Sequence, residues 1–204
     1  MASQIAHIVY AKKFLENDHP NWIDKDEFLL GSIFPDIRYI DKSISRHDTH
    51  RLFKEINLDF SGLSSFEAGW KFHLYCDMKR EEILTKYNFF EIPGADKFQG
   101  RSAKLLEEKM IYAKYNNWEK LCILMNNIPY FETGINVSRE TFEHWYAIIA
   151  NYVKQIPDYK TMHIFVSKVM KNGKEVDEII QGLKELEKNE KATAILGKVW
   201  KEII

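Results

Sequence analysis

Glycine and proline, the residues that most often interrupt regular structure, are scarce in this sequence. The 204 residues include 9 Gly and 5 Pro, together 14 residues or about 7% of the chain. Average usage of the two residues is nearer ~12%. So few chain-breaking residues argue against a sandwich or barrel of short strands, and also against a flexible linker protein.

Cysteine is scarce as well, and neither sign of charge is in clear excess. Cys76 and Cys122 cannot form a disulfide framework, and each lies in an apolar helical pattern typical of a buried thiol. The 29 Lys and Arg nearly balance the 30 Asp and Glu, so we expect no broad basic surface for nucleic acid. Hydrophobic residues make up 45% of the chain, which excludes disorder and predicts a substantial core.

Long hydrophobic segments are missing as well. The longest uncharged apolar stretches, such as residues 146–153, are far shorter than the ~20 residues that a membrane span requires. The first residues show no basic segment followed by a long apolar one, so no signal peptide is expected. We therefore predict a cytoplasmic protein without a transmembrane segment. The sequence carries no indication of its oligomeric state.

Hydrophobic residues recur at helical spacing through almost the whole chain. We expect helices over about 3–17, 24–34, 64–88, 97–116, 118–126 and 138–156, and then two more that separate at residues 172–173. Ser64 and Glu67 form a capping-box pattern at the start of the longest helix. The fold class predicted is a single all-α domain, a multi-helix bundle that spans residues 1–204.

Three polar residues mark expected helix starts, and two stretches between helices are expected to be loops. Ser3, Asp24 and Ser138 each precede an apolar helical pattern and are expected to cap it. Residues 35–48 are polar and interrupted, and residues 128–137 contain Pro and Gly, so both stretches are expected to be irregular.

Histidine is concentrated toward the N-terminus, where it is interleaved with aspartate. Five of the seven histidines lie at or before position 73, namely His7, His19, His47, His50 and His73. His73 and Asp77 are four residues apart on the predicted helix, so both side chains can reach one metal ion. A structural His–Asp pair in the core explains this spacing as well as a metal site does.

Two neighbouring segments supply further candidate ligands. Residues 46–50 contain His47, His50 and a carboxylate within five positions, and Asp36 follows a predicted helix end, where its carboxylate is free to project. Imidazole nitrogen and carboxylate oxygen suit Zn²⁺, with Mn²⁺ and Fe²⁺ as alternatives. The sequence therefore indicates a metal site built mainly from residues 7–82.

These motifs occur in an order that resembles the zinc-dependent phospholipase C family, which is related to the single-strand-specific zinc nucleases. The resemblance spans roughly residues 3–82 and rests on four features: His7 in a first helix, GSIFPD at 31–36, Thr49–His50, and FEAGWKFHLYCD at 66–77. It implies an all-α bundle of the phospholipase C type with a zinc cluster.

The resemblance also implies how the ligands divide between ions. One ion would be held by Asp36, His73, Asp77 and a histidine of residues 46–50. For that histidine, His50 is preferred to His47, because a Thr-His pair matches the family's smaller bacterial members. Asp77 would bridge to a second ion held by His7.

Two features of that family have no counterpart here. Its secreted members use a mature N-terminal amine as a ligand, whereas no signal peptide is expected in this chain. They also complete a third site with a His-x-x-x-Glu helix, whereas this chain offers Glu140 and His144 in the reverse order. We therefore expect one or two ions.

The chemistry implied is hydrolysis of a phosphoester by metal-activated water. Asp36 is the candidate general base, and Arg38 and Arg80 are candidate phosphate-binding residues. Surface ion pairs explain the two arginines equally well. The expected partner is a small phosphoester or a phospholipid headgroup.

Two other hypotheses fit the same residues. An HD-type metal-dependent phosphohydrolase would use His7, His47–Asp48 and Asp77, although the interval from Asp48 to Asp77 is short for that class. The other hypothesis is a non-catalytic helical binding protein with a degenerate metal site, which has kept the fold but lost catalysis. Asp48 separates the two enzyme hypotheses, because it is a ligand only in the HD-type site.

Overall fold

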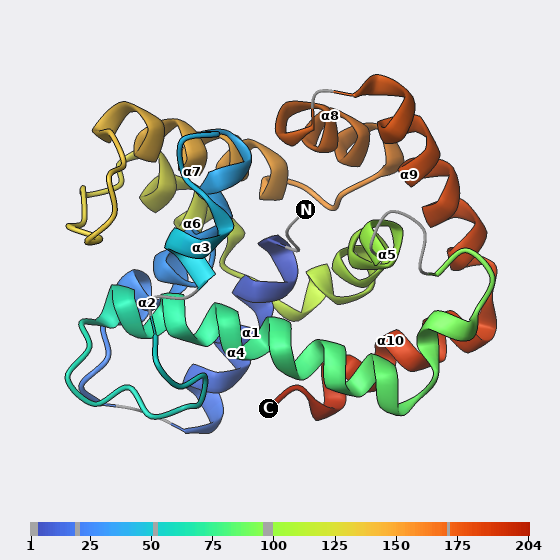
Figure 1. Cartoon of the computed structure of the whole chain (residues 1–204), viewed down its shortest axis with the longest axis horizontal. Helices are drawn as coiled ribbons and strands as arrows, with labels where there is room; N and C mark the ends of the chain where they lie inside the picture. Colours follow the sequence, from blue (N-terminus) through green and yellow to red (C-terminus); the bar gives the residue numbers. More distant parts are fainter. Residues whose placement is uncertain (1–3, 19–20, 51–52, 96–99, 171) are drawn as a thin grey trace.

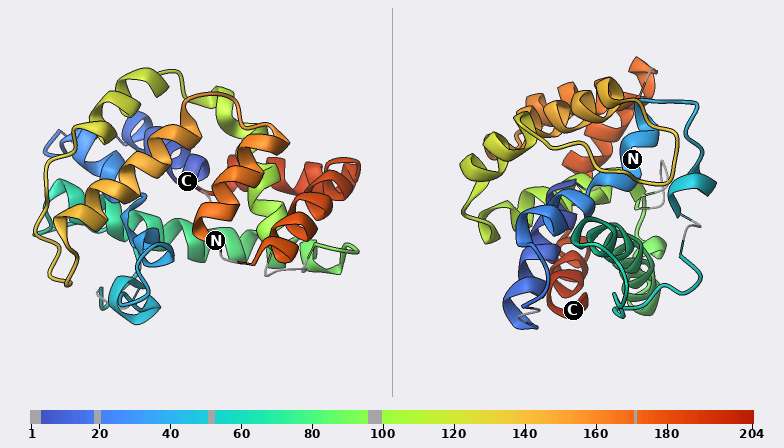
Figure 2. Two further views of the ribbon diagram at one scale, coloured as in Figure 1. Left: turned by 90° about the horizontal axis from the view of Figure 1, so that it is seen from above. Right: turned by 90° about the vertical axis from the view of Figure 1, so that its left-hand side faces the viewer.

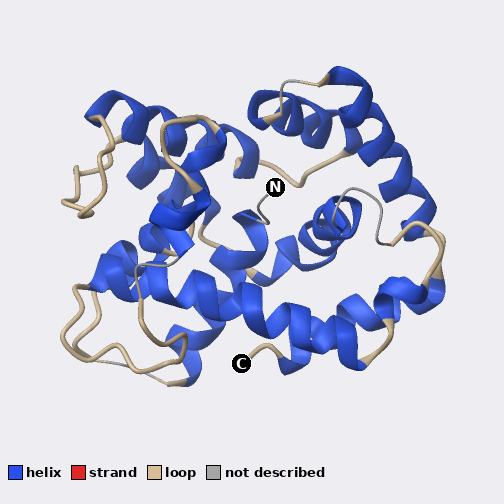
Figure 3. Ribbon diagram, viewed as in Figure 1, coloured by secondary structure: helices blue, strands red, loops and turns tan. Residues whose placement is uncertain are grey.

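The computed structural model describes residues 4–18, 21–50, 53–95, 100–170 and 172–204. In these ranges the chain forms ten α-helices joined by loops and short 3₁₀ segments, and it contains no β-strand (Figures 1 and 3). The predicted all-α class is therefore confirmed. The α-helices are α1 (Gln4–Asn17), α2 (Lys25–Gly31), α3 (Arg46–His50), α4 (Ser65–Lys86), α5 (Arg101–Ile111), α6 (Trp118–Asn126), α7 (Arg139–Val153), α8 (Tyr159–Val169), α9 (Gly173–Glu187) and α10 (Glu190–Glu202).

Side-chain caps fix the starts of several helices, as the sequence predicts. Asp24 accepts hydrogen bonds from two backbone amides at the start of α2, and Ser138 accepts one at the start of α7. Ser64 and Glu67 form both hydrogen bonds of the capping box at the start of α4. Each bond satisfies an amide that has no partner inside its own helix. The predicted cap at Ser3 lies outside the described residues.

Several boundaries differ from the prediction. Helix α2 ends at Gly31 rather than near residue 34, and residues 35–48, expected to be irregular, include most of a 3₁₀ segment, η1 (Phe34–Tyr39), and the start of α3. Pro35 fits the first turn of η1 because amides at that position need no intrahelical partner. Asn189 caps α10, so three helices follow α7 rather than two.

The helix expected over 97–116 is observed as α5 followed by η4 (Tyr112–Lys114). Residues 97–99, where it was expected to begin, lie outside the described residues. None of the described helices has the length and apolar character needed to cross a membrane.

Helix α4 is the element around which the ligand-bearing segments are arranged. The right-hand view of Figure 2 looks along α4 and shows α1 and α10 on the same side of it. Phe14 of α1, Phe28 of α2 and Phe72 of α4 pack together, with ring centroids 5.2–5.6 Å apart. Aromatic groups of this size bury a large apolar area. The cluster therefore fixes the three helices relative to one another, and its member Phe72 directly precedes His73 in the chain.

Helices α2 and α4 approach closely at two glycines. A Cβ atom at Gly31 would clash with the carbonyl oxygen of Phe66, and one at Gly69 would clash with that of Phe28. Both clashes involve backbone atoms, so no change of side-chain rotamer can relieve them. The close packing brings the end of α2 against the turn of α4 that carries His73.

We predict that Gly69→Ala lowers the free energy of unfolding by about 2–3 kcal/mol, because the added methyl group forces α2 and α4 apart. Gly197→Ala is the matched control, since a Cβ atom at this position of α10 meets nothing within 4 Å. The control is expected to be neutral or up to ~1 kcal/mol more stable. Urea denaturation measures both, and equal effects of the two substitutions would contradict the close packing.

Candidate metal centre

Four elements bring histidine and aspartate side chains to one place. His7 lies on α1, Asp36 on η1, His50 at the end of α3, and His73 and Asp77 on α4. They form two overlapping groups that could hold a metal ion, His7–Asp36–His73 and His50–His73–Asp77. In each group the ligand atoms lie within 4.8 Å of one another.

His73 occupies the middle of this cluster and is fully buried. Its Nδ1 lies 2.8 Å from the backbone carbonyl oxygen of Ser32. A carbonyl only accepts, so Nδ1 carries the proton and donates, which leaves the lone pair on Nε2. This arrangement is typical of a histidine that binds metal through its other nitrogen.

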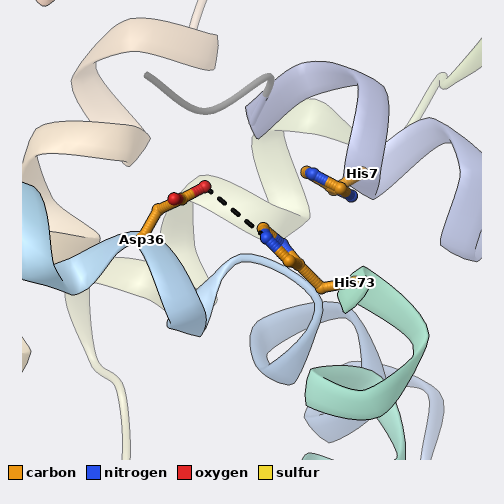
Figure 4. Close-up of side chains that lie close together, drawn as sticks. All are labelled: His7, Asp36 and His73. Atoms are coloured by element: carbon orange, nitrogen blue, oxygen red, sulfur yellow. Dashed lines mark ion pairs between the residues drawn. The ribbon is translucent and has the colours of Figure 1, made fainter. Parts of the chain in front are cut away.

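The Nε2 atom of His73 faces carboxylate oxygens instead of a donor. It lies 3.7 Å from Oδ2 of Asp36, the ion pair that is dashed in Figure 4. It also lies 3.7 Å from Oδ2 of Asp77 and has no hydrogen-bond partner among the described residues. A buried lone pair that faces two carboxylates is unfavourable unless a cation lies between them. The donor set at this point therefore fits a metal ion.

His7 and His73 stack with nearly parallel rings. Their centroids are 3.8 Å apart and their planes differ by 20°. Figure 4 shows the two rings lying alongside each other. Nε2 of His7 lies 3.6 Å from Oδ1 of Asp77, whereas Oδ2 of Asp77 lies 3.7 Å from Nε2 of His73. Asp77 thus directs each of its two oxygens toward a different imidazole.

The segment of residues 46–50 contributes one histidine to the cluster. The His50 ring lies 5.9 Å from the His73 ring, and its Nδ1 is 2.8 Å from Oγ1 of Thr49. His47 is exposed and belongs to neither of the two groups. Asp48 also lies outside them, because its carboxylate accepts hydrogen bonds from the amide and hydroxyl of Ser45, both at 2.7 Å.

Protonation states in the cluster suit cation binding. Burial lowers the pKa of His73 to about 4 and that of His50 to about 3, so both imidazoles are neutral at pH 7. Burial opposes ionisation of Asp36, but His73 and Arg38 outweigh it and hold its pKa below the usual value. The pKa of Asp77 is well below the usual value because Lys104 and the nearby imidazoles outweigh its desolvation.

The two candidate phosphate-binding arginines contact carboxylates. Nη2 of Arg38 lies 3.7 Å from Oδ1 of Asp36 and donates to the Tyr39 hydroxyl at 2.8 Å. Nε of Arg80 donates to Oε2 of Glu107 at 2.6 Å, and both of these side chains are buried. The ion pair of Arg80 is therefore buried, not on the surface as the alternative interpretation of the arginines assumed. Binding of phosphate by either arginine stays a prediction.

An open cleft of about 670 Å³ adjoins the cluster. His50 and Asp77 contribute to its wall, so the cluster is accessible from it. Lys104 of α5 also lines the cleft, with Nζ 3.4 Å from Oδ1 of Asp77. The remaining lining residues are Arg46, His47, Ile56, Leu74, Met78, Arg80, Glu81, Phe90 and Gly100.

Two consecutive carboxylates of α5 support the helices that carry the ligands. Glu107 accepts hydrogen bonds from Arg80, one turn beyond Asp77, and from Tyr10, one turn beyond His7. Glu108 accepts from the backbone amide of Ile5 at 2.9 Å and from the Tyr152 hydroxyl at 2.5 Å. Both glutamates are fully buried, and neither was identified from the sequence, because no local motif marks them.

We predict that Glu108 makes stability fall as pH rises. Burial, reinforced by the adjacent Glu107, raises the pKa of Glu108 from 4.5 to about 8. Between these values the folded protein retains a proton that the unfolded chain releases. The Glu108 contribution to the free energy of unfolding therefore decreases with pH, by about 1.4 kcal/mol per pH unit at most.

Glu108→Gln removes this titration and preserves the shape of the side chain. Stability curves of both proteins between pH 5 and 8 are expected to diverge, with wild type losing more stability than the variant as pH rises. The comparison cancels the contributions of His50 and His73, which both proteins share. Parallel curves would contradict a proton on buried Glu108.

No family model, no curated protein and no solved structure matches the chain. The arrangement of the site therefore rests on the residues themselves, and the resemblance to the zinc-dependent phospholipase C family stays an expectation.

Proposed function

We propose that the protein is a metal-dependent hydrolase of a phosphoester, of the phospholipase C-like type that its motifs resemble. The observation that carries the proposal is the buried Nε2 of His73, which faces the carboxylates of Asp36 and Asp77 without a hydrogen-bond partner among the described residues. A core histidine with a purely structural role would instead pair this nitrogen with a donor.

The geometry of Asp77 supports two ions. The His7 and His73 rings are nearly parallel and their centroids lie 3.8 Å apart, so the two imidazoles are spaced to serve neighbouring ions. Asp77 offers one oxygen to each nitrogen, which is the arrangement of a bridging carboxylate. A pair of ions about 3.5–4 Å apart is the spacing of two-metal hydrolytic centres. Asp36, His50 and His73 would then hold one ion, and His7 would hold the other.

Zn²⁺ is the proposed ion, because neutral imidazoles and carboxylates are its common ligands in hydrolytic sites. The same ligand types also accommodate Mn²⁺ or Fe²⁺. The bound ions would lower the pKa of a coordinated water toward ~7 and offset charge on a phosphoryl oxygen.

The chain's own residues supply the remaining steps. Asp36 is ionised and stands beside His73, so it is positioned to accept a proton from the attacking water. Arg38 holds the other oxygen of Asp36 and thereby orients the carboxylate. The adjoining cleft is of a size that admits a small phosphoester or a phospholipid headgroup.

We predict that the purified protein binds about two zinc ions per chain. His73→Ala and Asp77→Asn are expected to lose most of this metal, because each removes a central ligand, whereas His7→Ala retains one ion. His163→Ala is the control, since His163 pairs with Asp177 on the surface. Elemental analysis after desalting measures the metal content of each variant.

Hydrolysis across a panel of small phosphoesters provides the second measurement. Activity of the zinc-loaded protein is expected to fall to background in His73→Ala and Asp77→Ala. Wild-type protein that lacks stoichiometric metal and melts identically with and without EDTA would contradict the proposal. Such a result would favour a non-catalytic helical protein.

The HD-type alternative makes an opposite prediction at Asp48. The Asp48 carboxylate is engaged by Ser45 and lies outside both candidate groups, so Asp48→Ala is expected to keep the metal content and activity of wild type. Loss of metal in this variant, with its fold intact by circular dichroism, would favour the HD-type site instead.

A further inference from the structure

Gln4 begins helix α1 and is fully buried beside the metal centre. Its Nε2 lies 3.1 Å from Oδ2 of Asp36, in a hydrogen bond that joins α1 to η1. An ionised carboxylate only accepts hydrogen bonds, so the amide nitrogen of Gln4 is the atom that faces Asp36. The two residues are 32 positions apart in the chain, and no motif in the sequence marks this contact.

Core packing does not account for a glutamine at this position. The neighbouring Ile5 and Ile8 are fully buried as well, so an apolar side chain would suit this end of α1. Burying an amide costs free energy unless its polar atoms find partners. Oε1 of Gln4 is buried and has no hydrogen-bond partner among the described residues. The hydrogen bond to Asp36 is therefore the polar contact that holds this amide in place.

The oxygen of Asp36 that accepts from Gln4 is also the one that faces the proposed ion. Oδ2 lies 3.7 Å from Nε2 of His73, whereas Oδ1 lies 3.7 Å from Nη2 of Arg38. A carboxylate oxygen has two lone pairs, so Oδ2 can accept from Gln4 and still coordinate an ion. The amide is neutral and adds no positive charge that would repel the ion. With a neighbour at each oxygen, the Asp36 carboxylate is restrained from rotating.

Helix α1 also carries His7, which follows Gln4 by three residues and thus lies on the same face. In the group His7–Asp36–His73 the ligand atoms lie within 4.8 Å of one another. A shift of η1 relative to α1 would break the hydrogen bond between Gln4 and Asp36 and would change the spacing of these ligands. Gln4 therefore ties a ligand of one proposed ion to the helix that presents a ligand of the other.

We infer that Gln4 is a positioning residue of the metal centre, which keeps Oδ2 of Asp36 directed at the ion beside His73. This inference rests on the proposed function, because Gln4 has such a role only where an ion is bound. Residues that orient a ligand without touching the ion contribute about 10–100-fold to metal affinity.

Gln4→Met tests this role, because methionine preserves the length of the side chain and removes the hydrogen-bond donor. Zinc affinity, measured by competition with a chelator, is expected to be about 10–100-fold weaker at one of the two sites. The second readout is the visible absorption of protein saturated with Co²⁺, which depends on ligand geometry. The spectrum of Gln4→Met is expected to differ from that of wild type, because the Asp36 carboxylate is then free to rotate.

Ser102→Ala is the matched control. Ser102 is also buried and neutral, and its hydroxyl donates to the carbonyl oxygen of Ile179 at 2.8 Å, between α5 and α9. The substitution likewise removes one buried donor, but this donor does not contact a candidate ligand. Ser102→Ala is expected to keep the zinc affinity and the Co²⁺ spectrum of wild type.

Gln4→Met with wild-type zinc affinity, or with a wild-type Co²⁺ spectrum at saturation, would overturn the positioning role and leave the proposed function standing. Equal changes in Ser102→Ala would also overturn it, because they would show a general effect of losing a buried hydrogen bond. Wild type that binds neither zinc nor Co²⁺ would overturn the proposed function and, with it, the role of Gln4.

Discussion

The hydrogen bond from Nδ1 of His73 to the carbonyl oxygen of Ser32 sets the geometry of the whole centre. It fixes the ring and its tautomer, so that Nε2 points at the carboxylates of Asp36 and Asp77. The bond can form only because Gly31 and Gly69 have no Cβ atom, so that the backbones of α2 and α4 come into direct contact. Packing of the core and chemistry of the site are therefore linked through one short segment at the end of α2.

Helix α5 holds the helices that carry the candidate ligands His7 and Asp77. Glu107 joins the turns that follow His7 and Asp77, and Glu108 holds the first turn of α1. The same helix directs Lys104 toward the cleft. Burying a carboxylate costs free energy unless hydrogen-bond donors surround it. Here the donors come from α1 and α4, so the hydrogen bonds also fix these two helices against α5. One helix thus aligns the segments that carry the candidate ligands.

Features that depend on near neighbours in the chain could be predicted from the sequence. The caps at Asp24 and Ser64 and the proximity of His73 to Asp77 follow from spacing alone. Spacing could not separate His47 from His50, because the orientation of a five-residue helix against the rest of the fold decides which imidazole is inside. The contacts of Ser32, Lys104 and Glu107 join segments 27 or more residues apart, and no local pattern encodes them.

The proposed hydrolytic centre requires two ions, which Asp77 would bridge between His7 and His73. X-ray absorption spectroscopy at the zinc edge of the loaded protein tests this most directly. It is expected to show a first shell of nitrogen and oxygen, scattering from imidazole rings, and a zinc–zinc distance of about 3.5–4 Å. A shell without imidazole scattering, or a single ion without a neighbouring metal at full loading, would contradict it.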